Sequence, residues 1–139
     1  MALQNKIKEL EIFITSEIDI FTKMLQNADK ETYTKDPILK RAIDKSLNDI
    51  ILATVDLTAN FLRIKKRVVP GTYKEIMLSA YEFAGDLATK MASLTKCRNE
   101  TIHGYLKLNW ENVKTVKNSK DDILAYVNKV KELARDGKT

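Results

Sequence analysis

The chain has 139 residues, 44% of them hydrophobic and 31% charged, and carries a formal net charge of +5. This composition fits one globular domain spanning residues 1–139, and its apolar runs fall far short of the ~20 residues that a membrane-spanning helix needs. Because the N-terminus also lacks the basic and then apolar pattern of a secretion signal, we expect a cytoplasmic protein that does not contact a membrane.

Apolar residues recur at helical spacing from the N-terminus, which predicts a long amphipathic helix over residues 2–28. Residues 31–35 are polar and irregular, and we expect a connection there. Asp36 and Pro37 then form a strong helix start, because an aspartate can cap free amides and proline suits the first helical position. The helix that follows should be central, since residues 50–62 are apolar on most sides.

An acidic residue, Asp56, interrupts this apolar helix. It lies either on the one solvated stripe of the helix or in the interior, where an arginine or a backbone amide would have to pair with it. The solvated interpretation is favoured, because most acidic residues in helices are exposed to water.

A dense basic cluster, Arg63, Lys65, Lys66 and Arg67, follows towards the end of the central helix. If the fold brings the cluster near His103, the only histidine of the chain, its members would form a track for the phosphates of a nucleic acid. Alternatively they are solvated cations at a helix C-terminus, where the helix dipole favours positive charge. The net charge alone supports only weak, salt-sensitive attraction to phosphates.

Turn and cap signals divide the second half of the chain. Residues 68–71 end the central helix, and Thr72 with Glu75 three residues later forms a capping box that opens a short third helix. We expect Gly85 to close that helix in a left-handed conformation and Asp86 to cap a fourth.

The fourth helix is predicted to continue to Gly104, and the last one to run from Asn109 to about Ala134, although the polar residues 120–122 would suit a break. No alternating strand pattern and no internal repeat is visible. The predicted fold class is therefore all-α, an up-and-down bundle of about five helices.

The single cysteine, Cys97, excludes an internal disulfide and any multi-cysteine metal site. Because Cys97 neighbours the positively charged Arg98, its thiol could be reactive. A lone cysteine inside a helix is more often a small buried hydrophobic residue, and that interpretation is favoured.

Residues 98–105 bring together the only histidine of the chain, an arginine five residues before it and a tyrosine two residues after it. On a continuous helix, Arg98 and Tyr105 would extend the apolar stripe, and His103 would share a neighbouring stripe with Asn99. Arg98 and His103 would then be about 140° apart and would line two sides of a groove. Polar groups on a face that should be buried are costly unless they are paired or functional.

These residue types suit the cleavage of RNA without a metal. Histidine can act as base or acid because its unperturbed pKa is about 6.5, and a guanidinium stays charged and matches two phosphate oxygens at once. One His103 cannot be base and acid at the same time. Two copies facing each other across a twofold axis would supply two histidines and two arginines, so we expect a homodimer.

The same octet resembles the signature of the HEPN superfamily, and specifically of its HepT-like toxin ribonucleases: Arg, four residues, His, one residue and Tyr, with Asn directly after the Arg. Residues 69–75 resemble the family's Pro-x-x-Tyr-x-Glu helix start, and residues 56–62 resemble its mid-chain helix with an aspartate. The order and spacing of the three segments also agree with those of the family, so the resemblance covers roughly residues 39–134. Asn60 departs from it, because many relatives carry a histidine there.

The resemblance implies a homodimeric, metal-independent endoribonuclease without a cofactor, whose active groove lies between the protomers. Arg98 and His103 would be catalytic, and Asn99 would support them by orienting or binding phosphate. It also implies a type VII toxin-antitoxin system, in which an MntA-like nucleotidyltransferase antitoxin adds AMP to Tyr105. A bulky anionic adduct so close to His103 would keep the RNA substrate, a tRNA or an mRNA, out of the site.

Two rival functions use the same residues. In a histidine phosphotransfer bundle the histidine is exposed in mid-helix, whereas Gly104 directly follows His103 and should end the helix. A non-catalytic HEPN partner, such as a substrate-binding subunit of a nucleotidyltransferase, would keep the fold and the dimer without cutting RNA. Arg98, Asn99 and Tyr105 at the matching offsets favour the ribonuclease.

Overall fold

The computed structural model describes residues 2–98 and 108–135, and this part of the chain is all-α, as predicted. It contains eight α-helices and one 3-10 turn instead of about five helices, because two of the predicted helices are each split in two and Lys30–Lys35 form an additional short helix. Within the described residues, no helix is long and apolar enough to cross a membrane.

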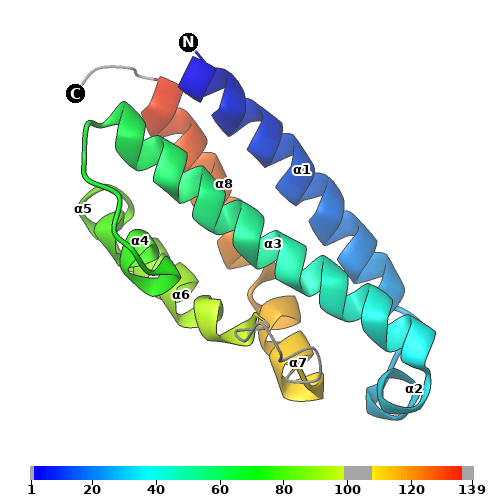
Figure 1. The fold of residues 1–139 in the computed structure, drawn as a ribbon. Coiled ribbons are helices and arrows are strands. Elements are labelled where there is room, and N and C mark those ends of the chain that lie inside the picture. The colour runs from blue at the N-terminus through cyan, green and yellow to red at the C-terminus, as the bar shows by residue number, and fades with distance from the viewer. Residues whose placement is uncertain (1, 99–107, 136–139) are drawn as a thin grey trace.

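Three long helices form the body of the molecule (Figure 1): α1 (Ala2–Leu25), α3 (Pro37–Ile64) and α8 (Lys120–Arg135). They run side by side and contact one another, with α1 packed along α3. Helix α3 is central, as predicted, and its apolar side chains between residues 43 and 62 are largely buried. Burial of such continuous apolar faces is the main stabilising contribution to a bundle.

The start of α3 follows the prediction. The carboxylate of Asp36 accepts hydrogen bonds from the amides of Ile38 and Leu39, both at 3.1 Å, and Pro37 is the first helical residue.

Asp56, in the middle of α3, is exposed, which confirms the solvated interpretation. Nearby, the side-chain amide of Asn60 donates to the Asp56 carbonyl at 2.8 Å.

Residues 31–35 were wrongly expected to be irregular, because Lys30–Lys35 form a short helix, α2. Asp29 accepts from the amide of Thr32 at 2.8 Å, and the Thr32 hydroxyl accepts from the amide of Asp29 at 2.9 Å. This reciprocal capping box starts the helix, and the burial of Tyr33, only 2% exposed, holds it against the bundle.

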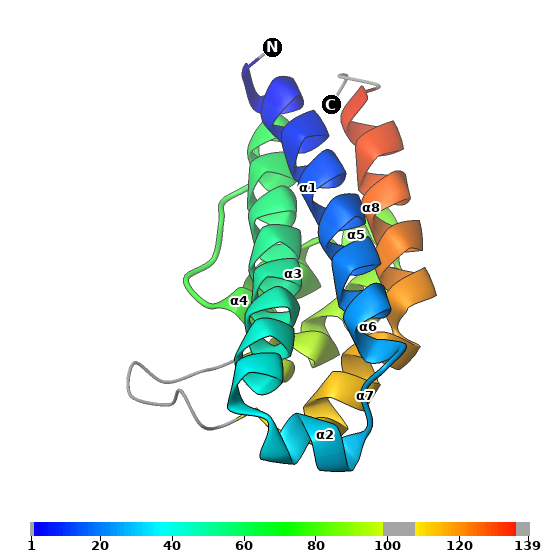
Figure 2. The ribbon, with the colours of Figure 1, turned by 90° about the vertical axis from the view of Figure 1, so that its right-hand side faces the viewer.

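The short helices α4 (Tyr73–Ser79), α5 (Tyr81–Ala84) and α6 (Asp86–Leu94) occupy another side of the molecule (Figure 2). The hydroxyl of Thr72 caps α4 by accepting from the Glu75 amide at 3.2 Å, which is one half of the predicted capping box, and it donates to the Glu75 carboxylate at 2.8 Å. The third helix is nevertheless split at Ala80. Gly85 ends α5 with a φ of 60°, which glycine adopts readily.

Two predictions for the fourth helix are wrong. Asp86 is its first residue and makes no side-chain cap hydrogen bond. The helix also stops at Leu94 and continues only as a 3-10 turn, η1 (Thr95–Cys97), instead of reaching Gly104. The hydroxyl of Thr95 donates to the Ala92 carbonyl at 2.7 Å, a side-chain bond in the last turn that competes with helix continuation.

The last predicted helix is also two helices, α7 (Trp110–Asn118) and α8. Asn109 lies at the start of α7, as predicted, and caps it in a capping box with Asn112. The break comes at Ser119, whose hydroxyl donates to the Thr115 carbonyl at 2.8 Å while its own carbonyl accepts from Ile123 at 2.9 Å. Ser119 therefore closes one helix and opens the next, one residue before the polar stretch that suited a break.

Candidate functional site

Arg98 lies directly after η1, and its backbone is extended, with φ −83° and ψ 164°. The prediction that it continues the stripe of a longer helix is therefore wrong. Its guanidinium carbon lies 4.3 Å from the ring centroid of Tyr73, the first residue of α4. A guanidinium over an aromatic face is attracted by the ring quadrupole, so Tyr73 restricts where the charge of Arg98 can point.

The elements on both sides of this contact are well packed. Cys97 is 1% exposed and belongs to the core, which confirms the interpretation as a small buried hydrophobic residue. Thr95 is also buried, and α4 packs against α6. The Thr72 cap fixes the first turn of α4 and hence the position of Tyr73. Arg98 is thus held at the point where the chain leaves the core.

Three of the predicted site residues, Asn99, His103 and Tyr105, lie outside the described residues. The predicted angular relation between Arg98 and His103 also concerns residues outside the described part of the chain. The structure does describe both flanks of this segment. Since η1 contacts α7, the two flanks lie close to each other.

The second flank is Leu108, which is 6% exposed. Its carbonyl accepts a hydrogen bond from the amino group of Lys40 on α3 at 3.0 Å. The same amino group lies 2.6 Å from a carboxylate oxygen of Asp44 and 3.1 Å from the hydroxyl of Tyr33. We call Lys40, Asp44 and Tyr33 the Lys40 cluster.

Tyr33 also donates its hydroxyl proton to Asp44. Burial of the phenol raises the pKa of Tyr33 well above its ordinary value, and the hydrogen bond to Asp44 and the charge of that carboxylate raise it further. The ring of Trp110, at the start of α7, lies 5.3 Å from the Tyr33 ring. The Lys40 cluster therefore joins α2 and α3 to the chain that enters α7.

Sequence reasoning missed this cluster. Lys40 and Asp44 are four residues apart and would be recognised as a helical ion pair. Neither Tyr33, from a segment expected to be irregular, nor the carbonyl of Leu108 could have been assigned to it. The Tyr73 contact was missed as well, although this tyrosine lies inside the Pro-x-x-Tyr-x-Glu motif.

The structure does not bring the basic cluster of residues 63–67 to Arg98. The C-terminal end of α3 and the end of η1 lie well apart in both ribbon views (Figures 1 and 2). Lys65 is 7% exposed, and Arg67 forms an ion pair with Glu82 at 3.0 Å. The hydrogen bond and charge of Glu82 raise the pKa of Arg67, and those of Arg67 lower the pKa of Glu82.

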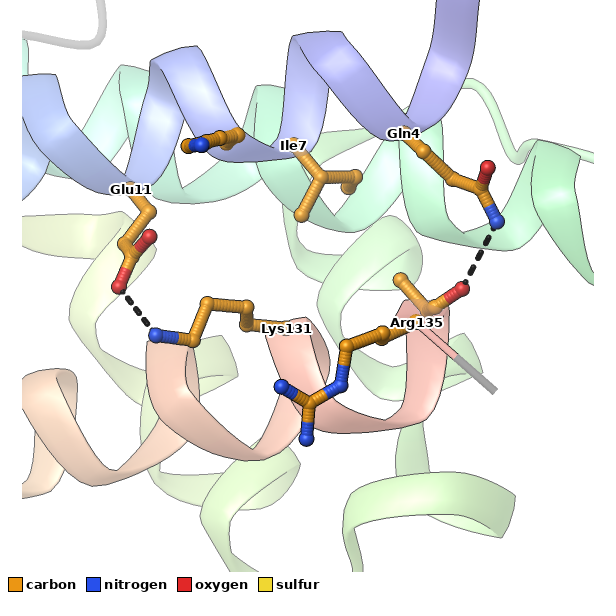
Figure 3. Close-up of a pocket in the computed structure, with 7 residues that line it drawn as sticks. Gln4, Ile7, Glu11, Lys131 and Arg135 are labelled. Carbon is orange, nitrogen blue, oxygen red and sulfur yellow. Dashed lines mark hydrogen bonds and ion pairs between the residues drawn. The ribbon is translucent and has the colours of Figure 1, made fainter. Parts of the chain in front are cut away.

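A groove of about 380 Å³ lies between α1 and α8 (Figure 3). An ion pair between Glu11 and Lys131 at 2.8 Å crosses it, and Gln4 donates to the Ala134 carbonyl at 3.2 Å near its other end. None of the residues that line it belongs to the flanks of residues 99–107. In the part of the chain that the structure describes, no three His, Cys, Asp or Glu side chains gather as metal ligands would.

Comparison with known proteins identifies the family of the chain. The family model described as Ribonuclease HepT-like matches residues 4–130, nearly the whole chain. No curated protein and no solved structure matches the chain. The chain belongs to the ribonuclease HepT-like family.

Proposed function

We propose that this protein is a metal-independent endoribonuclease and that Arg98 and His103 form its catalytic pair. The observation that carries the proposal is the placement of Arg98. Its guanidinium stacks on Tyr73 at 4.3 Å, at the point where the chain enters the segment with the only histidine. Membership of the ribonuclease HepT-like family supports the same class of reaction.

The chemistry follows from the two side chains. A neutral His103 takes the proton of a ribose 2′-hydroxyl, whose oxygen then attacks the neighbouring phosphorus. Arg98 stabilises the charge that develops on the phosphoryl oxygens, which a planar guanidinium can contact two at a time. A protonated His103 of a second copy gives its proton to the leaving 5′-oxygen. Asn99 supports the pair by orienting or binding phosphate.

Each chain has one histidine, so this mechanism requires a site shared by two protomers. We therefore propose that the active species is a homodimer. Ribonuclease activity per chain should fall on dilution, in step with dissociation of the dimer measured by analytical ultracentrifugation. Constant activity per chain in a monomer would contradict the shared site.

The cleavage test is incubation of the purified protein with labelled RNA in excess EDTA. Wild type should cut the RNA, whereas His103→Ala and Arg98→Ala should each lose at least about a hundredfold in rate, the scale of general acid-base and electrostatic catalysis. Arg135→Ala removes an exposed arginine at the end of α8 and is the matched control, with unchanged cleavage. An inactive wild type that still binds RNA would instead identify a non-catalytic partner.

We further propose that the protein is the toxin of a type VII toxin-antitoxin system and that an MntA-like nucleotidyltransferase neutralises it by adding AMP to Tyr105. Tyr105 is two residues from His103, so the added phosphate and nucleoside would compete with RNA for the same place. Mass spectrometry after coexpression with such a transferase should find AMP on Tyr105, and RNA cleavage should stop. Tyr105→Phe should remain active and unmodified; AMP on another tyrosine would contradict the assignment.

A further inference from the structure

The amino group of Lys40 has three hydrogen-bond donors, and three acceptors lie within reach of it. They are the Asp44 carboxylate at 2.6 Å, the Leu108 carbonyl at 3.0 Å and the Tyr33 hydroxyl at 3.1 Å. The Lys40 and Asp44 side chains are only 25% and 16% exposed. Hydrogen bonds from an ionised group are roughly twice as strong as neutral ones, and partial burial reduces their screening by water.

The neighbours of Lys40 are themselves fixed. Tyr33 is 2% exposed, its hydroxyl is bonded to Asp44, and its ring packs against Trp110. The amino group of Lys40 also lies 4.7 Å from the centroid of the same ring. The Lys40 cluster is thus a polar junction with a defined geometry. Through the Leu108 carbonyl, this junction reaches the backbone that follows residues 99–107.

We propose that Lys40 is a positioning residue for the ribonuclease site: by holding the Leu108 carbonyl, it fixes the point at which the segment that carries His103 and Tyr105 rejoins the bundle. Leu108 is five residues after His103 and three after Tyr105. The opposite flank is held at Arg98 by the contact with Tyr73. This role rests on the proposed function, because it concerns the placement of the proposed catalytic histidine.

The chain offers a matched control on the same helix. Lys45 and Asp49 form an ion pair with the same four-residue spacing, at 3.0 Å, but the Lys45 side chain is 78% exposed. Lys45→Met removes the same charge and the same type of helical pair as Lys40→Met, without touching the Leu108 carbonyl. A difference between the two variants therefore reports the junction, whereas a general effect of lost charge would appear in both.

The first experiment measures hydrogen exchange by mass spectrometry in peptides that cover residues 108–112. Lys40→Met should speed exchange there about tenfold or more, Lys45→Met should leave it unchanged, and Lys40→Arg should restore part of the protection. Equal exchange in Lys40→Met and Lys45→Met would overturn the proposal. This readout does not depend on RNA cleavage.

The second experiment measures the kinetics of RNA cleavage. A small displacement of a catalytic group can cost about a hundredfold in rate, so Lys40→Met should lower kcat by about ten- to a hundredfold with little change in KM. Lys45→Met should match wild type. Tyr126→Phe removes the buried hydrogen bond between Tyr126 on α8 and Thr58 on α3, at a distance from Lys40 along the helix. This variant controls for lost stability and should also keep the wild-type kcat.

Lys40→Met leaves the Asp44 carboxylate without its cation and could unfold the protein, because a half-buried unpaired charge is strongly destabilising. The double variant Lys40→Met/Asp44→Leu removes both charges and should show the same faster exchange and lower kcat. If wild type does not cleave RNA, the proposed function fails, and unchanged exchange in Lys40→Met then overturns the role of Lys40 separately. If exchange rises and kcat stays at the wild-type value, Lys40 is structural only and the proposal is overturned.

Discussion

The long-helix side of the molecule, formed by α1, α3 and α8, and the short-helix side, formed by α4 to η1 and α7, are held together differently. On the long-helix side, buried apolar residues follow one another with helical spacing over many turns. On the short-helix side, caps, breaks and polar contacts occur every few residues. Arg98 and Leu108, which flank the proposed catalytic segment, both belong to the short-helix side. Burial of apolar surface thus maintains the scaffold, and directional contacts hold Arg98 and Leu108.

The largest expected effect comes from removing a side chain that joins the two sides. Phe61 on α3 is fully buried and packs edge to face on Phe83 of α5, with ring centroids 5.0 Å apart. Phe61→Ala should lower the free energy of unfolding by about 3–5 kcal/mol, because the lost contacts and the cavity add together. Urea unfolding measures this. Ile38→Ala, on the same helix but 82% exposed, is the control and should change the value by less than about 0.5 kcal/mol.

The same titration tests whether the two sides unfold together. The only tryptophan, Trp110, reports on the short-helix side by fluorescence, and circular dichroism reports on all helices. Coincident transitions are expected, because α3 contacts helices of both the long-helix side and the short-helix side, and small domains usually unfold in one step. A tryptophan transition at lower urea would mean that the short-helix side opens alone.

A smaller effect should appear at alkaline pH, from a buried tyrosine inside the long-helix side. Tyr126 on α8 is fully buried and its hydroxyl lies 2.6 Å from that of Thr58 on α3. Burial raises the pKa of Tyr126 to about 12, from 10.0 in the unfolded chain, so its contribution to stability is complete below pH 10 and is lost as the pH rises to 12. The free energy of unfolding should fall by about 2–3 kcal/mol over this pH range.

Tyr126→Phe separates this titration from other alkaline effects, including that of Tyr33, whose pKa is also raised. At pH 8 the variant should be about 1 kcal/mol less stable, the usual value of a lost hydrogen bond. Between pH 10 and 12 its urea midpoint should fall less steeply than that of wild type. Parallel decreases in the two proteins would show that Tyr126 does not titrate in this range.

The same contrast explains which predictions from sequence succeeded. Apolar periodicity correctly placed α1 and α3, and the cap signals at Asp36, Thr72 and Asn109 correctly placed three helix starts. Periodicity failed at Thr95 and at Ser119, where the helix breaks without a change in the apolar pattern. A short polar side chain bonds the backbone at both breaks, but Thr54 and Thr58 make the same type of bond inside the unbroken α3, so the sequence carries no signal that separates the two cases.

The candidate site was predictable only in part. Residue types and spacing are enough to single out Arg98, and Tyr73 lies inside the Pro-x-x-Tyr-x-Glu motif. Their contact was not predictable, because it depends on where η1 ends and on how α4 packs against α6. The hydrogen bond that links the Lys40 cluster to Leu108 joins residues 68 positions apart, which no local pattern contains.

The smallest expected effect is at the contact between Tyr73 and Arg98, and it tests whether directional contacts position the site. A cation-π contact at a partly exposed ring contributes about 0.5–1 kcal/mol, and Tyr73 is 37% exposed. Tyr73→Leu should therefore lower kcat for RNA cleavage about two- to fivefold, because Arg98 then spends less time aimed at the phosphate. Tyr73→Phe keeps the aromatic face and should restore the wild-type rate. Equal losses in both variants would assign the effect to the phenol hydroxyl instead of the ring, and no loss in either would mean that α4 contributes only packing beside Arg98.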